Sequence, residues 1–293
     1  MAVTAFSSAQ VALVTNDKPV LVGSNAVESA AVSHWLRAND LTGTSYDSTT
    51  LPIKRAYDRF THLPTSPSAA NGLHYLSFDL GADVKPWDMI MIGGHNFGTL
   101  GLSICKVQKA DSNAFSSGLT DVHSFSPGSS NKRLVAFLAS QYTTTDARYV
   151  RLVINLTTGT GIPEVGEFWL GRRRHLPYNF NSSTQNLRTR SDIVRFESRS
   201  GVTTNYVLSS GRAIREGSID IDDSDHHDEV AGWWTDCDYG SQSFLWIEEP
   251  GTTPQNCHMM TTTPELSFEQ TGPTNRKLDL AMVESAPYLS GES

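Results

Sequence analysis

Short strand-like runs, separated by clusters of Gly, Pro, Asn and Ser, recur along the chain and restrict its fold more than any other feature. The clearest runs of the first half span residues 11–15, 72–80, 87–94, 100–108, 132–139, 147–156 and 165–171. Short strands at regular spacing, with turn residues between them, are typical of β-sandwiches and barrels. The sequence therefore predicts a mostly β protein.

Two of these runs predict different surroundings. In "ARYVRLVINL" (147–156) the residues alternate at period two, which predicts a half-buried antiparallel strand. One face would carry Tyr149, Arg151, Val153 and Asn155, and the other Val150, Leu152, Ile154 and Leu156. The run "WDMIMI" (87–92) is almost continuously apolar, which is typical of a strand buried on both faces.

The second half predicts strands on either side of one helix. Strands are expected at residues 192–200, 205–210, 213–221, 243–249, 257–263, 266–270 and 276–285. The helix is expected at about 224–239, because an apolar stripe recurs there at i, i+3, i+4 and i+7. This stripe consists of Val230, Trp233, Trp234 and Cys237. A weaker candidate, "AVESAAVSHWLRAN" (26–39), fits either a short helix or a loop with one strand.

A change of composition after Gly171 predicts a domain boundary. The run "RRRHLPYNFNSSTQN" is basic, then polar and rich in turn residues, without clear periodicity. We expect a β-sandwich over residues 1–174 and a β domain with one helix over 175–293. A chain of 293 residues suits one large domain or two ordinary ones.

Charge and cysteine content exclude several classes of protein. The formal net charge of -8 argues against a protein that follows nucleic-acid phosphates. Three cysteines, Cys105, Cys237 and Cys257, give no disulfide framework. The N-terminus lacks the pattern of a signal peptide, and no apolar run reaches the roughly 18 residues of a membrane span. We expect no nucleic acid partner and no membrane span.

The run "DDSDHHDE" (222–229) is the sharpest candidate for metal chemistry. Imidazole and carboxylate groups suit zinc, iron or manganese, and would serve a metal-dependent hydrolase. The favoured interpretation is a solvated, acidic helix N-terminus, in which Asp222, Asp223 and Ser224 cap the helix. Cys237, Cys257 and His258 form a second metal candidate, although a cysteine on an apolar stripe usually behaves as a small hydrophobic residue.

The only basic run is "GRRRH" (171–175). Arg172, Arg173 and Arg174 could grip phosphate, an acidic glycan or an acidic partner. The favoured alternative is a solvated linker whose arginines pair with acids of a neighbouring domain or subunit, with a subunit contact preferred.

The stretch "GGHNFGTLG" (93–101) is interpreted as structural. Gly93 and Gly94 allow the chain to leave the sheet, Asn96 and Gly98 suit a turn, and His95 is expected to be a hydrogen-bonded turn residue. The stretch would lie between two strands, with no helix N-terminus to hold a phosphate. With no nucleophile elbow or phosphate loop in the chain, we expect no enzyme, and predict no catalytic, cofactor-binding or metal-binding residues and no cofactor.

Two segments together resemble a known family. "LHYLSFDLGADVKPWDMIMIGGHNFGTLGLSICKVQ" and "ARYVRLVINLTTGTGIPEVGEFWLGR" are similar to galactose-binding-like (discoidin-like) jelly-roll sandwiches, over about residues 20–174. The variant with "GGHNF" and "PEVGEFWLGR" resembles domains of tailed-bacteriophage virion proteins. The second half, with "FLWIEEPGTTP" and "RKLDLAMVESAP", is similar to ring-forming domains of tail-tube and distal-tail proteins, although the order of the two domains is reversed.

The resemblance implies a structural component of a phage tail tip or baseplate. It would be made in the host cytoplasm, assemble as a homo-oligomeric ring and contact other tail proteins. The alternative function is a carbohydrate-binding module protein that attaches to a host-surface glycan. The resemblance assigns no binding residues, because the family's ligand loops vary.

Overall fold

The computed structural model is mostly β, which confirms the expected fold class. It describes residues 4–5, 18–37, 40–59, 63–68, 72–83, 85–126, 133–142, 147–156, 161–176, 178, 186–197, 203–221, 224–262, 268–272 and 275–285. The strand predicted at residues 11–15 lies outside this part of the chain. None of the described helices is long and apolar enough to cross a membrane.

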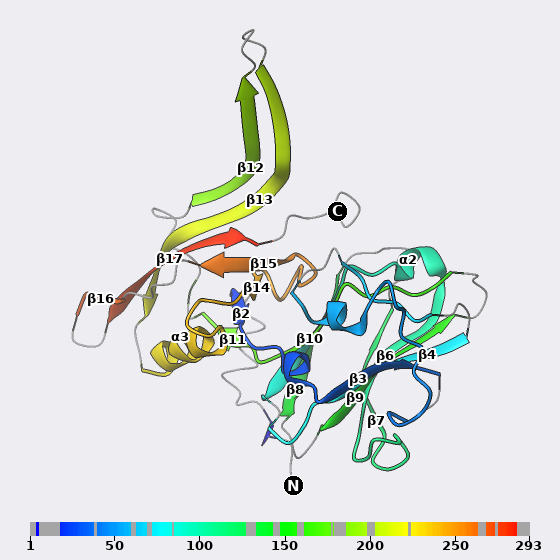
Figure 1. Ribbon diagram of the computed structural model, residues 1–293. Helices are drawn as coiled ribbons and strands as arrows, with labels where there is room; N and C mark the ends of the chain where they lie inside the picture. Colours follow the sequence, from blue (N-terminus) through cyan, green and yellow to red (C-terminus); the bar gives the residue numbers. More distant parts are fainter. Residues whose placement is uncertain are drawn as a thin grey trace.

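Two antiparallel sheets form a sandwich (Figure 1). The four-stranded sheet has the order β1 (Thr4–Ala5), β8 (Leu134–Tyr142), β5 (Trp87–Gly93) and β10 (Glu167–Gly171). The five-stranded sheet has the order β3 (Val32–Leu36), β4 (Gly72–Asp79), β9 (Tyr149–Leu156), β6 (Leu102–Ala110) and β7 (Thr120–Phe125). Both sheets contribute to one core, in which Phe168 of β10 stacks on Phe78 of β4 at 5.5 Å between ring centroids.

A third, eight-stranded sheet lies beside the sandwich (Figure 1). Its order is β11 (Arg174–His175), β2 (Val20–Val22), β14 (Phe244–Ile247), β15 (Cys257–Thr262), β17 (Arg276–Glu284), β13 (Thr203–Ile221) and β12 (Asn186–Glu197), and β16 (Phe268–Gln270) also pairs with β17. Strand β2 comes before the predicted boundary at residue 174, yet it pairs with β14. The boundary itself stays a prediction.

The three sheets and one helix form successive layers, because several strands are buried on both faces. On β5, Ile90 and Ile92 point into the sandwich core, whereas Met89 and Met91 contact the eight-stranded sheet. Helix α3 (Ser224–Asp236) covers the opposite face of that sheet. The continuous apolar run of β5 is thus explained, and its predicted burial is confirmed.

Helix α3 also confirms the stripe predicted from the sequence. Val230, Trp233 and Cys237 are buried in one cluster, and Trp234 packs against it. The cluster contains side chains from β2, β13, β14, β15 and β17. The helix is therefore stabilised by tertiary packing of its apolar face.

The structure corrects two local predictions and decides between the two alternatives for residues 26–39. Strand β9 is not half-buried: Arg151 and Val153 are each only 3% exposed, because Leu41 and Phe115 from two loops cover that face. A one-turn helix, α2 (Phe97–Leu100), follows "GGHN" where only a turn between strands was expected. Residues 26–39 contain a short 3-10 helix, η1 (Ala26–Ser29), and then strand β3.

A hairpin extends from the body of the protein (Figure 1). Strand β13 pairs with β17 only from Ile214 to Ile221, whereas its pairing with β12 continues to Thr203 at the far end. The outer part of the hairpin is thus a two-stranded ribbon. Among the described residues, β12 forms the last strand on this side of the eight-stranded sheet.

Gly171 allows β10 and β2 to approach closely, and a substitution there tests the layered packing. A Cβ atom at Gly171 would lie 2.2 Å from Val22 Cγ1 and 2.8 Å from the Ser24 backbone oxygen. We expect Gly171→Ala to lower the free energy of unfolding by about 1–3 kcal/mol, as overpacking usually does. Gly272→Ala is the control, because its nearest atom would be 3.7 Å away. Equal stability of the two variants in urea unfolding would contradict the packing described here.

Candidate functional site

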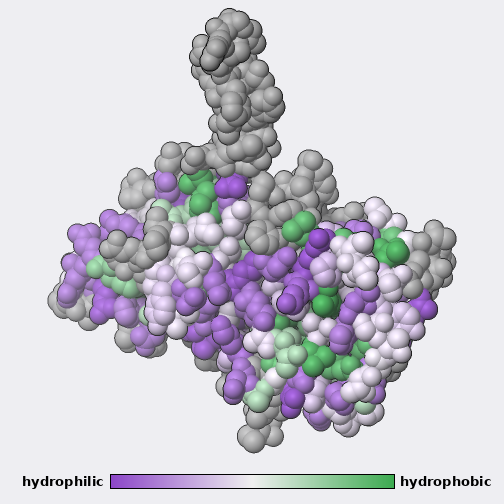
Figure 2. Space-filling model, viewed as in Figure 1, coloured by the Kyte–Doolittle hydropathy of each residue, from purple (hydrophilic) through white to green (hydrophobic). Residues whose placement is uncertain are grey.

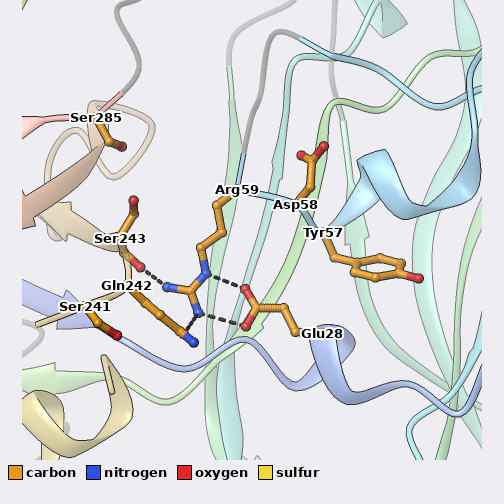
Figure 3. Close-up of a pocket in the computed structure, with 8 residues that line it drawn as sticks. All are labelled: Glu28, Tyr57, Asp58, Arg59, Ser241, Gln242, Ser243 and Ser285. Carbon is orange, nitrogen blue, oxygen red and sulfur yellow. Dashed lines mark hydrogen bonds and ion pairs between the residues drawn. The ribbon is translucent and has the colours of Figure 1, made fainter. Parts of the chain in front are cut away.

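An open cavity of about 410 Å³, lined by residues with polar or charged groups, lies at the junction of the sandwich and the eight-stranded sheet (Figure 3). We call it the junction pocket. Its residues come from η1, from the segment after η2 (Ile53–Ala56), from the loop before β14 and from the end of β17. They are Glu28, Tyr57, Asp58, Arg59, Ser241, Gln242, Ser243 and Ser285. On the face drawn in Figure 2, hydrophilic residues cover much of this junction.

Helix η1 is fixed on β10 by a single asparagine. The side chain of Asn25 accepts hydrogen bonds from the backbone N–H groups of Val27 and Leu170, both at 3.1 Å. Its amide nitrogen donates to the Phe168 carbonyl at 3.2 Å. This cap holds the first turn of η1, and therefore Glu28, against the sandwich.

The backbone of Arg59 is held in an unusual conformation. Its φ is 65°, in the left-handed region that non-glycine residues seldom adopt. Its N–H donates to the Glu167 carboxylate at 2.9 Å. This contact stabilises a conformation that directs the Arg59 side chain into the junction.

The Arg59 guanidinium joins the two parts of the protein. On the sandwich side it donates to both carboxylate oxygens of Glu28, one of them at 2.8 Å from Nη2. On the other side it donates to the Ser243 carbonyl and, at 2.8 Å, to Gln242 Oε1. It also lies over the Trp169 ring, 4.9 Å from the centroid. Figure 3 shows the contacts with Glu28, Gln242 and Ser243, which use much of the donor capacity of the guanidinium.

Glu167 lies beneath this contact with no exposed surface. Burial raises the pKa of its carboxyl well above the usual value, and the negative charges of Asp58 and Glu28 raise it further. The Arg59 N–H and guanidinium act in the opposite direction. The base of the junction is therefore an acidic cluster held together by one arginine.

The remaining groups make the pocket a hydrogen-bonding surface. The hydroxyl of Ser285 donates to the Met259 carbonyl at 3.0 Å, and that of Ser241 donates to Asp238 Oδ2 at 2.9 Å. Each hydroxyl oxygen retains acceptor capacity. The carboxylate of Asp58 points away from the Arg59 guanidinium (Figure 3). Such a set suits a ligand that carries several hydroxyl groups.

The structure brings the arginines of "GRRRH" to acids of this same chain. Arg173 contacts buried Asp88 of β5, at 3.3 Å from Nε to Oδ1, and donates to the Leu138 carbonyl at 2.8 Å. Arg174 contacts Asp236 and Glu229 of α3, at 3.0 and 3.5 Å. Neighbouring residues point to opposite faces of an extended chain, so the two arginines bind different layers. Arg172 is half-buried.

The pairing predicted for the arginines is intramolecular in Arg173 and Arg174. The expected solvated linker is wrong for these two residues, because both are buried, and a subunit contact is not needed to explain them. Burial and the nearby Arg173 charge lower the pKa of His175, the last residue of the run, to about 4. Near neutral pH His175 is therefore uncharged.

The described members of the metal candidates are not assembled into a site. Within the described residues, no group of three or more His, Cys, Asp or Glu side chains is placed to hold a metal ion. Cys237 packs under α3, whereas Cys257 lies in the cluster on the other face of the sheet. His258 pairs with buried Glu284, at 3.1 Å from Nδ1 to Oε1.

In the cluster of residues 222–229, His227 lies near Phe268 at 4.8 Å between ring centroids, and the side chain of Asp228 is 81% exposed. Asp222 and Asp223 lie outside the described residues. Their predicted capping role therefore stays a prediction.

His95 occupies the structural position expected of it. It is 4% exposed, accepts a hydrogen bond from the Phe97 N–H at 3.3 Å and stacks on the Phe97 ring at 4.5 Å. Gly94 has a φ of 61°, which agrees with the predicted departure from the sheet. This stretch lies apart from the residues that line the junction pocket.

Sequence reasoning did not single out the junction pocket. Glu28 and Arg59 are 31 residues apart, and Gln242 is a further 183 residues along the chain. No spacing rule links such positions. The only local signal was a polar "YDR" between two less regular segments, and this tripeptide carries no specific chemistry.

Comparison with known proteins gives matches only among solved structures. No family model and no curated protein matches the chain. It is similar to chitosan-binding module 1 of a chitosanase/glucanase from Paenibacillus sp. IK-5, with 12% identity, a TM-score of 0.36, and 50% of this chain covering 97% of that one.

A second similar structure is the family 32 carbohydrate-binding module of C. perfringens NanJ in complex with galactose. The identity is 14%, the TM-score is 0.36, and 52% of this chain covers 99% of that module. A third is the family 32 module of AlyQ in complex with 4,5-unsaturated mannuronic acid, with 21% identity, a TM-score of 0.32, and 42% of this chain covering 90% of that module. TM-scores this low do not identify a binding site, so the site described above rests on the residues of this chain.

Proposed function

We propose that this protein is a non-catalytic carbohydrate-binding protein whose ligand occupies the junction pocket. The observation that supports the proposal is the convergence of carboxylate, amide and hydroxyl groups on one open cavity with a fixed base. Binding sites are usually concave, occur preferentially where domains meet, and use a few placed polar groups to orient the ligand. Carbohydrate binding was the alternative function expected from the sequence, and it replaces the phage tail component as the first candidate.

The charges of the pocket narrow the class of sugar. The lining holds two carboxylates, Glu28 and Asp58, and one cation, Arg59, so it carries a net negative charge. A polyuronate would be repelled, because like charges at an interface are unfavourable. Neutral sugars, or amino sugars whose ammonium group pairs with a carboxylate, match the lining.

The contacts of Glu28 support a binding role without catalysis. Glycoside hydrolysis uses two carboxyl groups, one of which gives a proton to the leaving oxygen. Both oxygens of Glu28 instead accept hydrogen bonds from Arg59. This carboxylate is therefore committed to holding the junction together.

Asp58→Asn tests the pocket directly. We expect binding of glucosamine or galactose oligosaccharides to weaken by about tenfold or more, because hydrogen bonds to charged groups contribute about 1.5–3 kcal/mol. Affinity would be measured by isothermal titration calorimetry. Asp83→Asn, in the exposed turn after β4, is the matched control and should leave affinity unchanged. Oligosaccharide binding that is equal in Asp58→Asn and the parent protein would place the ligand elsewhere.

A second candidate function is a structural subunit of a tailed-phage tail tip or baseplate. The observation that favours it is the projecting β12–β13 hairpin, in which β12 is the edge strand of the eight-stranded sheet within the described residues (Figure 1). Such edges are templates for pairing with another chain. Electron microscopy of the parent particle, or of the protein at high concentration, would test it. A protein that stays monomeric and lies outside any particle would count against it.

A further inference from the structure

We propose that Tyr239 is an aromatic platform that extends the junction pocket, so that its ligand is an oligosaccharide rather than a single sugar. The proposal rests on the function proposed above and adds the length of the ligand. Its evidence comes from a different feature, the turn between α3 and β14.

Tyr239 is unusually exposed for its size. Its exposed fraction is 64%, compared with 42% for Tyr178, the other tyrosine among the exposed large hydrophobic residues of the described chain. An aromatic ring carries 150–250 Å² of surface that folding normally buries. Folding thus leaves this surface available to a ligand.

The backbone of Tyr239 is strained as well. Its φ is 55°, and its neighbours Asp238 and Gly240 have φ values of 49° and 80°. Glycine adopts this region freely, whereas another residue pays roughly 1–2 kcal/mol there. Because Tyr239 is both strained and exposed, we expect a glycine at this position to stabilise the fold at least as well. Strain of this kind is concentrated at functional sites.

Backbone hydrogen bonds hold the turn that carries Tyr239, and the turn leads into the residues that line the pocket. The Tyr239 N–H donates to the Trp234 carbonyl at 2.9 Å, and the Gln242 N–H donates to the Cys237 carbonyl at 3.1 Å. Gly240 packs on Trp234 so tightly that a Cβ atom there would lie 2.4 Å from the ring. Ser241 and Gln242, the next two residues after Gly240, line the pocket. These hydrogen bonds therefore hold the backbone of Tyr239 and the backbone of one wall of the pocket in the same turn.

The proposed binding site thus has two parts, which the turn of residues 238–242 connects. The pocket offers carboxylate, amide and hydroxyl groups to the hydroxyls of one sugar. The Tyr239 ring offers a flat apolar face, which suits the C–H face of a neighbouring sugar. Stacking on an aromatic ring tolerates variation in the hydroxyl pattern of the sugar. The ring would therefore raise the affinity for an oligosaccharide more than the selectivity for one sugar.

The test compares monosaccharides with their oligosaccharides. Glucosamine, galactose and oligosaccharides of four to six units would be titrated into the parent protein, Tyr239→Ala, Tyr239→Gly and Tyr239→Phe. We expect Tyr239→Ala and Tyr239→Gly to weaken oligosaccharide binding about tenfold, with monosaccharide binding unchanged within twofold. Tyr239→Phe should retain oligosaccharide binding, because the ring remains. Tyr178→Ala controls for loss of an exposed tyrosine elsewhere.

Thermal unfolding separates a binding role from a structural one. Glycine relieves the positive φ, so Tyr239→Gly should keep the parent's melting temperature or raise it while binding falls. Oligosaccharide affinity retained in Tyr239→Ala, or equal affinity of the parent for short and long ligands, would overturn this inference alone. A parent protein that binds none of these sugars would overturn the proposed function itself.

Discussion

Replacement of Arg59 by alanine is expected to lower the free energy of unfolding by about 3 kcal/mol or more. The substitution removes the cation that contacts Glu28, Gln242 and Ser243 together. Removing one partner of a buried ion pair leaves an uncompensated charge, which typically costs about 3–5 kcal/mol. Glu28 is 26% exposed, which places the expected loss at the lower end of that range.

Arg55→Ala is the matched control for this experiment. Arg55 lies four residues earlier in the same segment and is half-buried. Surface substitutions of this kind usually change stability by no more than about 0.5 kcal/mol. Urea unfolding of both variants, followed by tryptophan fluorescence, would measure the difference. If Arg59→Ala lost less than about 1 kcal/mol, the guanidinium would not be what holds the junction.

The second large effect is expected at the ion pair between Arg173 and Asp88. Their side chains are 4% and 2% exposed, so the pair is shielded from water. Arg173→Met should lower the free energy of unfolding by about 3–5 kcal/mol, because Asp88 would be left buried beside an apolar side chain. Adding Asp88→Asn should recover part of that loss. Arg172→Met is the control for a neighbouring arginine.

The pH dependence of stability provides a second readout for this pair. Burial raises the pKa of Asp88 to about 6, and the charge of Arg173 only partly offsets it. A folded-state pKa above the unfolded value means that the folded protein binds the proton more tightly. The resulting stability is complete below the unfolded pKa and is lost as the pH rises through about 6.

The parent protein should therefore lose stability relative to Asp88→Asn between about pH 4 and pH 6, by on the order of 2 kcal/mol. Other carboxyl groups, such as Asp79, whose pKa is lowered by its hydrogen bond from Arg148, act in the opposite direction. The comparison between the two proteins cancels their effects. Parallel stability curves across this pH range would contradict a raised pKa at Asp88.

Strand positions could be predicted from the sequence, because side chains on a sheet repeat at period two. The strand expected at residues 276–285 and the apolar run of residues 87–94 correspond to β17 and β5 within one or two residues. The stripe of α3 was equally clear, because it stands at helical spacing. Local periodicity is enough for such elements.

The junction pocket could not be predicted, because its residues meet only through tertiary structure. Arg59 lies in a segment without periodicity, and its conformation depends on Glu167, which is 108 residues away. Covering loops caused the error on β9 in the same way. Arg151 looks like a solvent-facing residue in the sequence, yet its guanidinium lies over the rings of Tyr75 and Phe115.

Strand β2 has a consequence for the order in which the chain can fold. Its three residues pair with β14, so residues 20–22 cannot complete their pairing before residues 245–247 are present. Contacts of such large sequence separation are slow to form. During synthesis the N-terminal segment would leave the ribosome long before its partner strand, and one face of the sandwich would stay uncovered until then. Closure of the sheet between β2 and β14 would therefore come late, after residues 245–247 have been made.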